Sequence, residues 1–221
     1  MAGDAWHESC PCAAWSFPVT CHPSPAAFMK YRTVLMFGAP GSGKGTHGKI
    51  LGAIPGYIHC SCGEVFRNLN PETPLGKIFV EYSGQGQLVP DEPTIELWQR
   101  YVHGLMASGR FNPKSDTLVL DGIPRNLHQA HMLDDFLDVI AVFNMCSGSF
   151  KNLVARLQRR ALKDNRLDDA SLDVIRARLK TYEAETRPVL NFYGPKAVHR
   201  INTDGTPSQT FLKVLRRVVK F

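Results

Sequence analysis

The chain has 221 residues, of which 43% are hydrophobic and 21% charged, enough for one sizeable core and at most two small domains. Its 26 basic and 20 acidic residues give a net charge of +6 at pH 7, which favours an anionic ligand such as a nucleotide, a nucleic acid or a phosphate-rich surface. No apolar run approaches the roughly 18 to 20 residues that a membrane-spanning helix needs. These quantities predict a soluble domain and argue against an integral membrane protein.

Residues 1–28 differ sharply in composition from the rest of the chain. They contain no Lys or Arg and only two acidic residues. They lack the basic start and apolar stretch of a secretory signal, and the arginines of a transit peptide. We expect either a disordered extension or translation from a start upstream of a functional Met29. Residues 29–221 then carry 26 basic and 18 acidic residues, a net charge of +8.

The six cysteines do not form the pattern of a disulfide-stabilised protein. Three of them lie within the first 21 positions, and a chain of this length does not need a disulfide framework. Cys10, Cys12, Cys21 and His22 are residues of types that can bind zinc, but their spacing differs from that of structural zinc sites. We predict no zinc site there.

From Met29 onward, short apolar runs alternate with longer amphipathic ones. Continuous apolar runs at 33–37, 117–120 and 139–145 predict strands buried on both faces, and 57–60 and 198–201 are weaker candidates. Helices are predicted at 43–54, 63–69, 75–83, 92–108, 127–137, 150–162 and 172–192. A last helix is predicted from Pro207, with Thr206 as N-cap and Gln209 completing a capping box. This order predicts an α/β fold, with helices over a parallel sheet and the ligand at the carboxyl ends of its strands.

A glycine-rich segment directly follows the first predicted strand. Residues 38–46 read GAPGSGKGT, in which glycines let backbone N–H groups surround a phosphate at the positive end of the following helix. Lys44 would reach the transferred phosphate and Thr46 would help to hold Mg²⁺. Because the nine residues stand between a strand and a helix, we favour a phosphate loop over a mere tight turn. This segment resembles the phosphate loop of the P-loop NTPases, and the resemblance implies their fold class, a three-layer α/β/α structure with a central five-stranded parallel sheet.

A second charged pair follows the strand predicted at 117–120. Asp121 stands at its carboxyl end, where a carboxylate can hold Mg²⁺-bound water, and Arg125 follows on a turn stiffened by Pro124. A guanidinium in this place can bind a phosphate in bidentate fashion. The alternative is a turn with a surface arginine. We favour this alternative less, because the charged pair of Asp121 and Arg125 would face the phosphate loop.

Basic residues are concentrated between positions 156 and 178. They are Arg156, Arg159, Arg160, Lys163, Arg166, Arg176 and Arg178. Taken alone, such a stretch indicates a solvated helix face or a nucleic-acid-binding patch. Phosphoryl transfer offers a further reason, because the protein must neutralise charge that spreads over the oxygens of the migrating group.

Six segments together resemble the nucleoside monophosphate kinases, and within them the adenylate kinases. The resemblance covers residues 33–221. Its segments occur in the family's order: GAPGSGKGT, HCSCGEVFR, QGQLVPDEPTI, DGIPRNLHQA, RLQRRALKDNRLDD and RLKTYEAETRPVLNFY.

The resemblance implies a kinase domain at 29–221 that reversibly transfers the γ-phosphate of MgATP to AMP, giving two ADP. It implies two mobile parts, a flap for the nucleoside monophosphate at about 61–90 and a short lid at about 160–168. Only five residues separate Arg160 from Arg166, too few for the zinc-binding lid domain of many bacterial relatives. The implied partners are ATP, AMP and Mg²⁺, with no zinc, nucleic acid or membrane, in a cytoplasmic monomer.

The resemblance also implies the role of each matching residue. Catalytic charges would come from Lys44, Arg125, Arg156, Arg160, Arg166 and Arg178. The ATP site would comprise Gly41, Ser42, Gly43, Lys44, Gly45, Thr46, Arg156, Arg160 and Gly205. The AMP site would comprise Cys62, Arg67, Gln87, Leu88, Val89, Gly122, Arg125, Gln129, Arg166 and Arg178. Asp121 and Thr46 would hold Mg²⁺ through water.

Four positions matter for how closely the chain matches the family, and two of them, Gln129 and Cys62, bear on the choice of acceptor base. The side-chain amide of Gln129 can read the adenine edge with one donor and one acceptor, although an exposed helix residue is the alternative. Pyrimidine kinases tend to have Asn there, so Gln129 favours AMP. Cys62 stands where adenylate kinases usually have Thr and pyrimidine-specific relatives often have Ala, which removes a hydroxyl contact. Ile123 and His47 replace the usual Phe and Gln of their motifs.

Three alternatives therefore stay open. The segment from Asp169 to Arg178 is one residue longer than in short family members, which leaves Arg176 as an alternative to Arg178. The acceptor of a UMP/CMP-type or broader kinase is a second possibility. A nucleotide- or nucleic-acid-binding protein that has lost phosphoryl transfer is a third, motivated by the net charge of +8.

Overall fold

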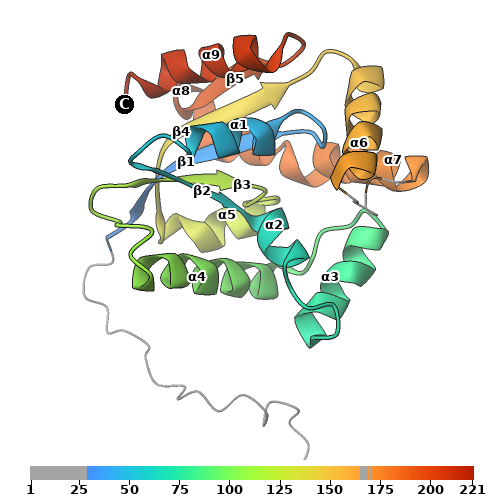
Figure 1. The fold of residues 1–221 in the computed structure, drawn as a ribbon, viewed down its shortest axis with the longest axis horizontal. Helices are drawn as coiled ribbons and strands as arrows, with labels where there is room; N and C mark the ends of the chain where they lie inside the picture. Colours follow the sequence, from blue (N-terminus) through green and yellow to red (C-terminus); the bar gives the residue numbers. More distant parts are fainter. Residues whose placement is uncertain (1–28, 165–168, 170) are drawn as a thin grey trace, which may run out of the picture.

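The computed structural model describes residues 29–164, 169 and 171–221 (Figure 1). Its centre is a five-stranded sheet in the order β2-β3-β1-β4-β5, in which every neighbouring pair is parallel. The strands are β1 (Tyr31–Gly38), β2 (Tyr57–Ser61), β3 (Thr117–Asp121), β4 (Leu137–Cys146) and β5 (Val198–Asn202). The five predicted strands are thereby confirmed, including the two weaker candidates.

Helices precede or follow every strand. They are α1 (Lys44–Leu51), α2 (Cys62–Arg67), α3 (Pro74–Gly84), α4 (Asp91–Ala107), α5 (Leu127–Asp134), α6 (Phe150–Asp164), α7 (Leu172–Thr181), α8 (Val189–Ala197) and α9 (Pro207–Val218). A π-helical segment, η2 (Tyr182–Thr186), joins α7 to α8.

Alternate residues of β1 face opposite layers of helices. Val34 and Met36 are buried with side chains from α1 and α9, whereas Leu35 and Phe37 are buried with side chains from α4, α5 and α8. Figure 1 shows α1 and α9 on one face of the sheet and α4 and α5 on the other. Burial on both faces explains why the strands read as continuous apolar runs, and it confirms the three-layer α/β/α class.

Four further helices gather at the carboxyl ends of the strands (Figure 1). Helices α6 and α7 share a small apolar cluster of their own, formed by Leu153, Leu157, Ile175 and Leu179. Helices α2 and α3 lie within the flap predicted at 61–90. Residues 165–168 of the lid predicted at 160–168 lie outside the described part of the chain. Residues 1–28, with the cysteines and the histidine considered for zinc, also lie outside it.

The helix expected at 43–54 ends at Leu51, with Gly52 as its C-cap. Two other predicted helix boundaries are also wrong. The single helix expected at 172–192 is three segments, because Pro188 has no N–H to continue the α-helical hydrogen bonding and a π segment precedes it. The helix expected at 127–137 ends at Asp134, because Leu137 instead pairs with Tyr31 at the start of β4. Apolar periodicity continues across both boundaries and so conceals them.

The start of α9 follows its prediction closely. The Thr206 N–H donates to Gln209 Oε1 at 3.0 Å, and the Gln209 N–H donates to Thr206 Oγ1 at 3.3 Å. The capping box is therefore confirmed. Among the described helices, none combines the length and the hydropathy required to cross a membrane.

Candidate active site

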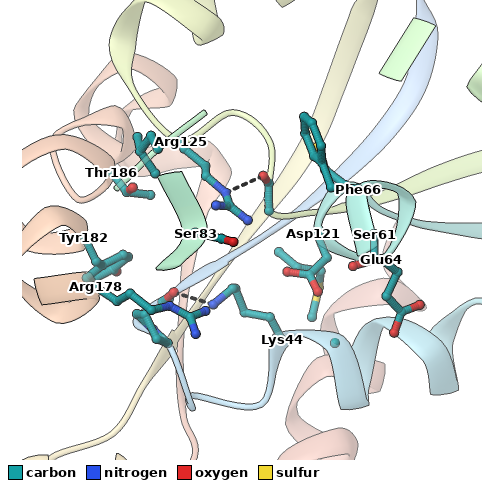
Figure 2. Close-up of a pocket in the computed structure, with 18 of the residues that line it drawn as sticks. Lys44, Ser61, Glu64, Phe66, Ser83, Asp121, Arg125, Arg178, Tyr182 and Thr186 are labelled. Carbon is teal, nitrogen blue, oxygen red and sulfur yellow. Dashed lines mark hydrogen bonds between the residues drawn. The ribbon is translucent and has the colours of Figure 1, made fainter. Parts of the chain in front are cut away.

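A cavity of about 290 Å³ lies where the strands end. The parallel register places Ser61 beside Asp121, and Asp121 beside Met36 of the central strand, so that β1, β2 and β3 finish at the same edge. The residues that line the cavity belong to the phosphate loop, α2, α3, the turn after β3, α6, α7 and η2, among other elements. Figure 2 shows the charged side chains of these separate segments directed toward one another.

The phosphate loop is held tightly against the sheet at its first residue. Gly38 has a φ of +140°, and a Cβ there would collide with the Met145 carbonyl oxygen of β4. Only glycine therefore allows the loop to leave β1 at this angle. Five residues expected at the ATP site then line the cavity: Gly41, Gly43, Lys44, Gly45 and Thr46.

Lys44 folds back over the loop from the first position of α1. Its Nζ donates to the Gly38 carbonyl at 2.6 Å and to the Ala39 carbonyl at 3.1 Å (Figure 2). Burial lowers the pKa of Lys44 to about 8; Asp121 opposes the shift, and nearby arginines including Arg160 add to it. The ammonium therefore stands in a site already crowded with positive charge, which is the condition for binding a polyanion.

Asp121 and Thr46 bring oxygen ligands to the same cavity. The Asp121 carboxylate packs close to the start of α1, because a Cβ on Gly45 would lie only 3.2 Å from its Oδ2. Carboxylate and hydroxyl oxygens suit Mg²⁺, which keeps several waters and relies on substrate phosphates for further ligands. Within the described residues there is no group of three or more His, Cys, Asp or Glu able to hold a metal. The two oxygen donors of Asp121 and Thr46 fit a magnesium ion that is also held by the phosphates of a nucleotide.

Two arginines converge above Gly63, at the start of α2. A Cβ on that glycine would lie 3.3 Å from the Arg67 guanidinium and 3.6 Å from that of Arg125. Arg125 is fixed by its Nε, which donates to the Gly122 carbonyl at 2.8 Å across the cis Ile123–Pro124 bond. Two guanidiniums from different elements thus face one region, in a geometry suited to a phosphate dianion.

A buried acid joins two further arginines. Asp169 is fully buried and pairs with Arg160 of α6, whose Nε donates to Oδ2 at 2.8 Å and whose Nη2 lies 2.5 Å from it. Its other oxygen accepts from Arg178 of α7. Both arginines line the cavity. Asp169 therefore fixes the side chains of two helices relative to each other at the cavity wall.

The uncharged residues expected at the acceptor site also line the cavity. They are Cys62, Gln87, Leu88, Val89, Gly122 and Gln129. Burial raises the pKa of the Cys62 thiol to about 11, so the thiol is neutral at physiological pH. Gln129 is only 1% exposed, which identifies it as part of the cavity wall and not as a surface residue of α5.

Three predicted site residues lie outside this cavity, and the structure does not describe a fourth. Ser42 is buried and does not reach the cavity lining. Arg156 is turned toward the segment after β5, where its Nη2 donates to the Thr203 carbonyl at 2.8 Å. Gly205 belongs to the same segment, and neither Arg156 nor Gly205 lines this cavity. Arg166 lies outside the described residues.

Several cavity residues were not predicted. Ser83 of α3, Thr181 at the end of α7, and Tyr182 and Thr186 of η2 all line it. Glu64 of α2 also reaches it and forms an ion pair with Lys49 at 2.6 Å. Glu64 stands inside a segment that resembles the kinases, which was the available signal. Thr181, Tyr182 and Thr186 stand inside another such segment, residues 178–193, although the apolar pattern conceals the helix break after Thr181. Ser83 lies outside the segments that resemble the kinases.

Comparisons with known proteins agree with this geometry. A family model described as adenylate kinase matches residues 36–198. The adenylate kinase of Flavobacterium psychrophilum is 35% identical over 193 residues, covering 84% of this chain and 97% of the relative. That of a Cyanothece species is 38% identical over 169 residues, covering 72% and 80%. The chain belongs to the adenylate kinase family.

Proposed function

We propose that this protein transfers the γ-phosphate of MgATP to AMP, reversibly, giving two ADP. The observation that carries the proposal is the convergence of Lys44, Arg125, Arg160 and Arg178 on a cavity shared by the phosphate loop and Asp121. These four cations outnumber the two carboxylates beside them, Asp121 and Asp169, so the cavity keeps an excess of positive charge that suits a polyanion. Family membership supplies the reaction that uses such a site.

Catalysis here rests on positioning and charge. During phosphoryl transfer, negative charge spreads over the oxygens of the migrating group, and the protein needs no covalent intermediate. Lys44 and the phosphate-loop N–H groups would bind the donor phosphates, while Arg125 would hold the acceptor phosphate. Asp169 fixes Arg160 and Arg178, and these two arginines would face the phosphoryl group as it moves from the donor to the acceptor. Mg²⁺ held near Asp121 and Thr46 would neutralise part of the charge on the donor phosphates.

The acceptor is proposed to be AMP because of Gln129. Its amide lies in the wall of the cavity and can offer a donor and an acceptor to the adenine edge. Cys62, in the same wall, brings a neutral thiol where many relatives would offer a hydroxyl. We therefore expect AMP to be preferred, with a smaller margin than a hydroxyl at this position would give.

One contact closes part of the cavity. Thr181 Oγ1 donates to the carbonyl of Gly86 at 3.2 Å, joining the region after α3 to the end of α7. These residues are 95 positions apart in sequence, and both line the cavity. A wall that closes in this way would exclude water and suppress hydrolysis of ATP in the absence of an acceptor.

A panel of acceptors tests the proposal. Purified protein is assayed with MgATP against AMP, GMP, CMP and UMP at matched concentrations, in a coupled assay for ADP. We expect AMP to give the highest kcat/KM. Faster phosphorylation of CMP or UMP would contradict the proposed acceptor. Tight ATP binding without any ADP formed would contradict phosphoryl transfer itself.

A further inference from the structure

The first residue of α4 carries a carboxylate that does not cap its own helix. The N-cap position of α4 is Pro90, which has no capping side-chain bond. The bonds of the Asp91 carboxylate run instead to the turn and first residues of α5, some 35 to 38 positions away in sequence. The side chain is 17% exposed. This arrangement calls for an explanation beyond helix stability.

Asp91 accepts three hydrogen bonds. Its Oδ1 accepts from Asn126 Nδ2 at 2.9 Å and from Gln129 Nε2 at 2.7 Å. Its Oδ2 lies 2.9 Å from His128 Nδ1. Burial raises the pKa of Asp91, but these hydrogen bonds outweigh burial and hold the pKa below its ordinary value. At neutral pH the group is therefore an ionised carboxylate, which can only accept hydrogen bonds.

The opposite end of the Gln129 amide is also fixed. Its Oε1 accepts from the backbone N–H of Arg125 at 2.8 Å. A group that only accepts therefore faces one end of the amide, and a group that only donates faces the other. The amide has one orientation compatible with both, with Nε2 toward Asp91 and Oε1 toward Arg125. A rotated amide would place two acceptors in contact at one end and two donors at the other.

Two bonding positions of this amide remain for a ligand. A glutamine amide has two N–H donors and two acceptor lone pairs, and the contacts with Asp91 and Arg125 use one of each. The remaining N–H and lone pair belong to a side chain that lines the cavity. This pair complements the adenine edge, which presents an acceptor at N1 and a donor at the 6-amino group. Hypoxanthine presents the reverse, a donor at N1 and an acceptor at O6.

We propose that Asp91 is a positioning residue that fixes the Gln129 amide and thereby makes the acceptor site select AMP over IMP. The inference rests on the proposed function, because it assigns Gln129 to the acceptor base. Asp91 does not line the cavity itself and acts through Gln129. Asn126 is ordered by the same carboxylate, and its Oδ1 in turn accepts the backbone N–H of Gln129 at 2.8 Å.

The test compares Asp91→Ala, Asp91→Asn and Glu92→Ala with the wild type. Glu92 is the neighbouring exposed acid in the first turn of α4, so its replacement controls for the lost charge at the helix end. Steady-state constants are measured for ATP, AMP and IMP. Asp91→Asn is the conservative variant, because its Oδ1 can still accept from Asn126 and Gln129.

We expect Asp91→Ala to raise the KM for AMP about tenfold and to lower the AMP-to-IMP ratio of kcat/KM about tenfold, with the KM for ATP unchanged. Asp91→Asn should remain within about threefold of the wild type, and Glu92→Ala should match it. If Asp91 had a purely structural role, its loss would instead change the KM values for ATP and AMP together. An unchanged AMP-to-IMP ratio in Asp91→Ala, or an Asn variant as impaired as the Ala variant, would overturn the inference. A wild type that prefers CMP or UMP would instead overturn the proposed acceptor, and the inference with it.

Discussion

Replacing Asp169 by Asn removes one charge from the middle of a buried cluster and changes almost nothing in its volume. Breaking a buried ion pair by removing one partner costs about 3–5 kcal/mol, because the remaining charge is left uncompensated. Here the remaining charges are Arg160 and Arg178, whose side chains are 31% and 20% exposed. Water therefore compensates them in part, and the Asn oxygen can still accept one hydrogen bond. We expect a loss of about 2–3 kcal/mol in the free energy of unfolding.

The same substitution should reduce turnover. Arg160 and Arg178 would no longer be held relative to each other at the cavity wall, and each loss of 1.4 kcal/mol in transition-state stabilisation is about tenfold in rate. We expect kcat to fall by about 10- to 100-fold. Urea denaturation followed by circular dichroism measures the first effect, and the coupled assay with saturating ATP and AMP measures the second.

Asp173→Asn is the matched control. Asp173 pairs with Arg176 at 3.1 Å on the same helix, but its side chain is 89% exposed. An exposed pair of this kind contributes at most about 1 kcal/mol. We expect nearly wild-type turnover and a small loss of stability in this variant. If Asp169→Asn and Asp173→Asn were indistinguishable in both measurements, the role given to the buried acid would be refuted.

Three further substitutions have defined outcomes. Arg125→Ala should lower kcat about 10²- to 10³-fold with little loss of stability, as lost transition-state charge contacts do, whereas Ala at the exposed Arg159 should leave turnover near that of the wild type. Gly86→Ala should cost about 1–2 kcal/mol in a urea titration, because φ is +72° and a Cβ would lie 3.0 Å from Arg178 Cγ; Gly84→Ala, where a Cβ meets nothing within 4 Å, should be neutral or stabilising. The pKa of Asp91 is lowered in the folded protein, so its ionised form stabilises the fold at neutral pH and this contribution is lost as the pH falls through that pKa. Asp91→Asn should therefore be less stable than the wild type at pH 7, and the difference should shrink below about pH 4; a constant difference across this range would contradict the assignment.

Much of the fold and half of the site follow from local sequence. The strands are buried on both faces, so each appears as an uninterrupted apolar run. Asp121 ends β3, and Lys44 and Arg125 follow β1 and β3 after short loops, so the short-range sequence alone places them at the edge of the sheet. Parallel strands end at the same edge of a sheet. The position of the ligand at this edge could therefore be predicted without knowledge of the residues that surround it.

The remaining features depend on contacts between distant segments. Asp169 was visible as an acid within a basic stretch, but its burial requires α6 and α7 to pack against each other. The contact of Asp91 with Gln129 joins residues 38 positions apart. Thr186 reaches the cavity through a π segment, and apolar periodicity does not register a change of hydrogen-bonding pattern within a helix. Sequence patterns report each element's burial and not which neighbour buries it.

The strand order β2-β3-β1-β4-β5 has a consequence for how substitutions can change the substrate specificity of this enzyme. The residues assigned to the acceptor base, Cys62, Gln87 and Gln129, follow β2 and β3, on one side of the central strand. Arg156 and Gly205, which the resemblance assigns to the donor, follow β4 and β5 on the other side. The two nucleosides are therefore assigned to different halves of the sheet, and the phosphate loop lies between them. Substitutions that retune the acceptor can accumulate in one half while recognition of ATP in the other half is preserved.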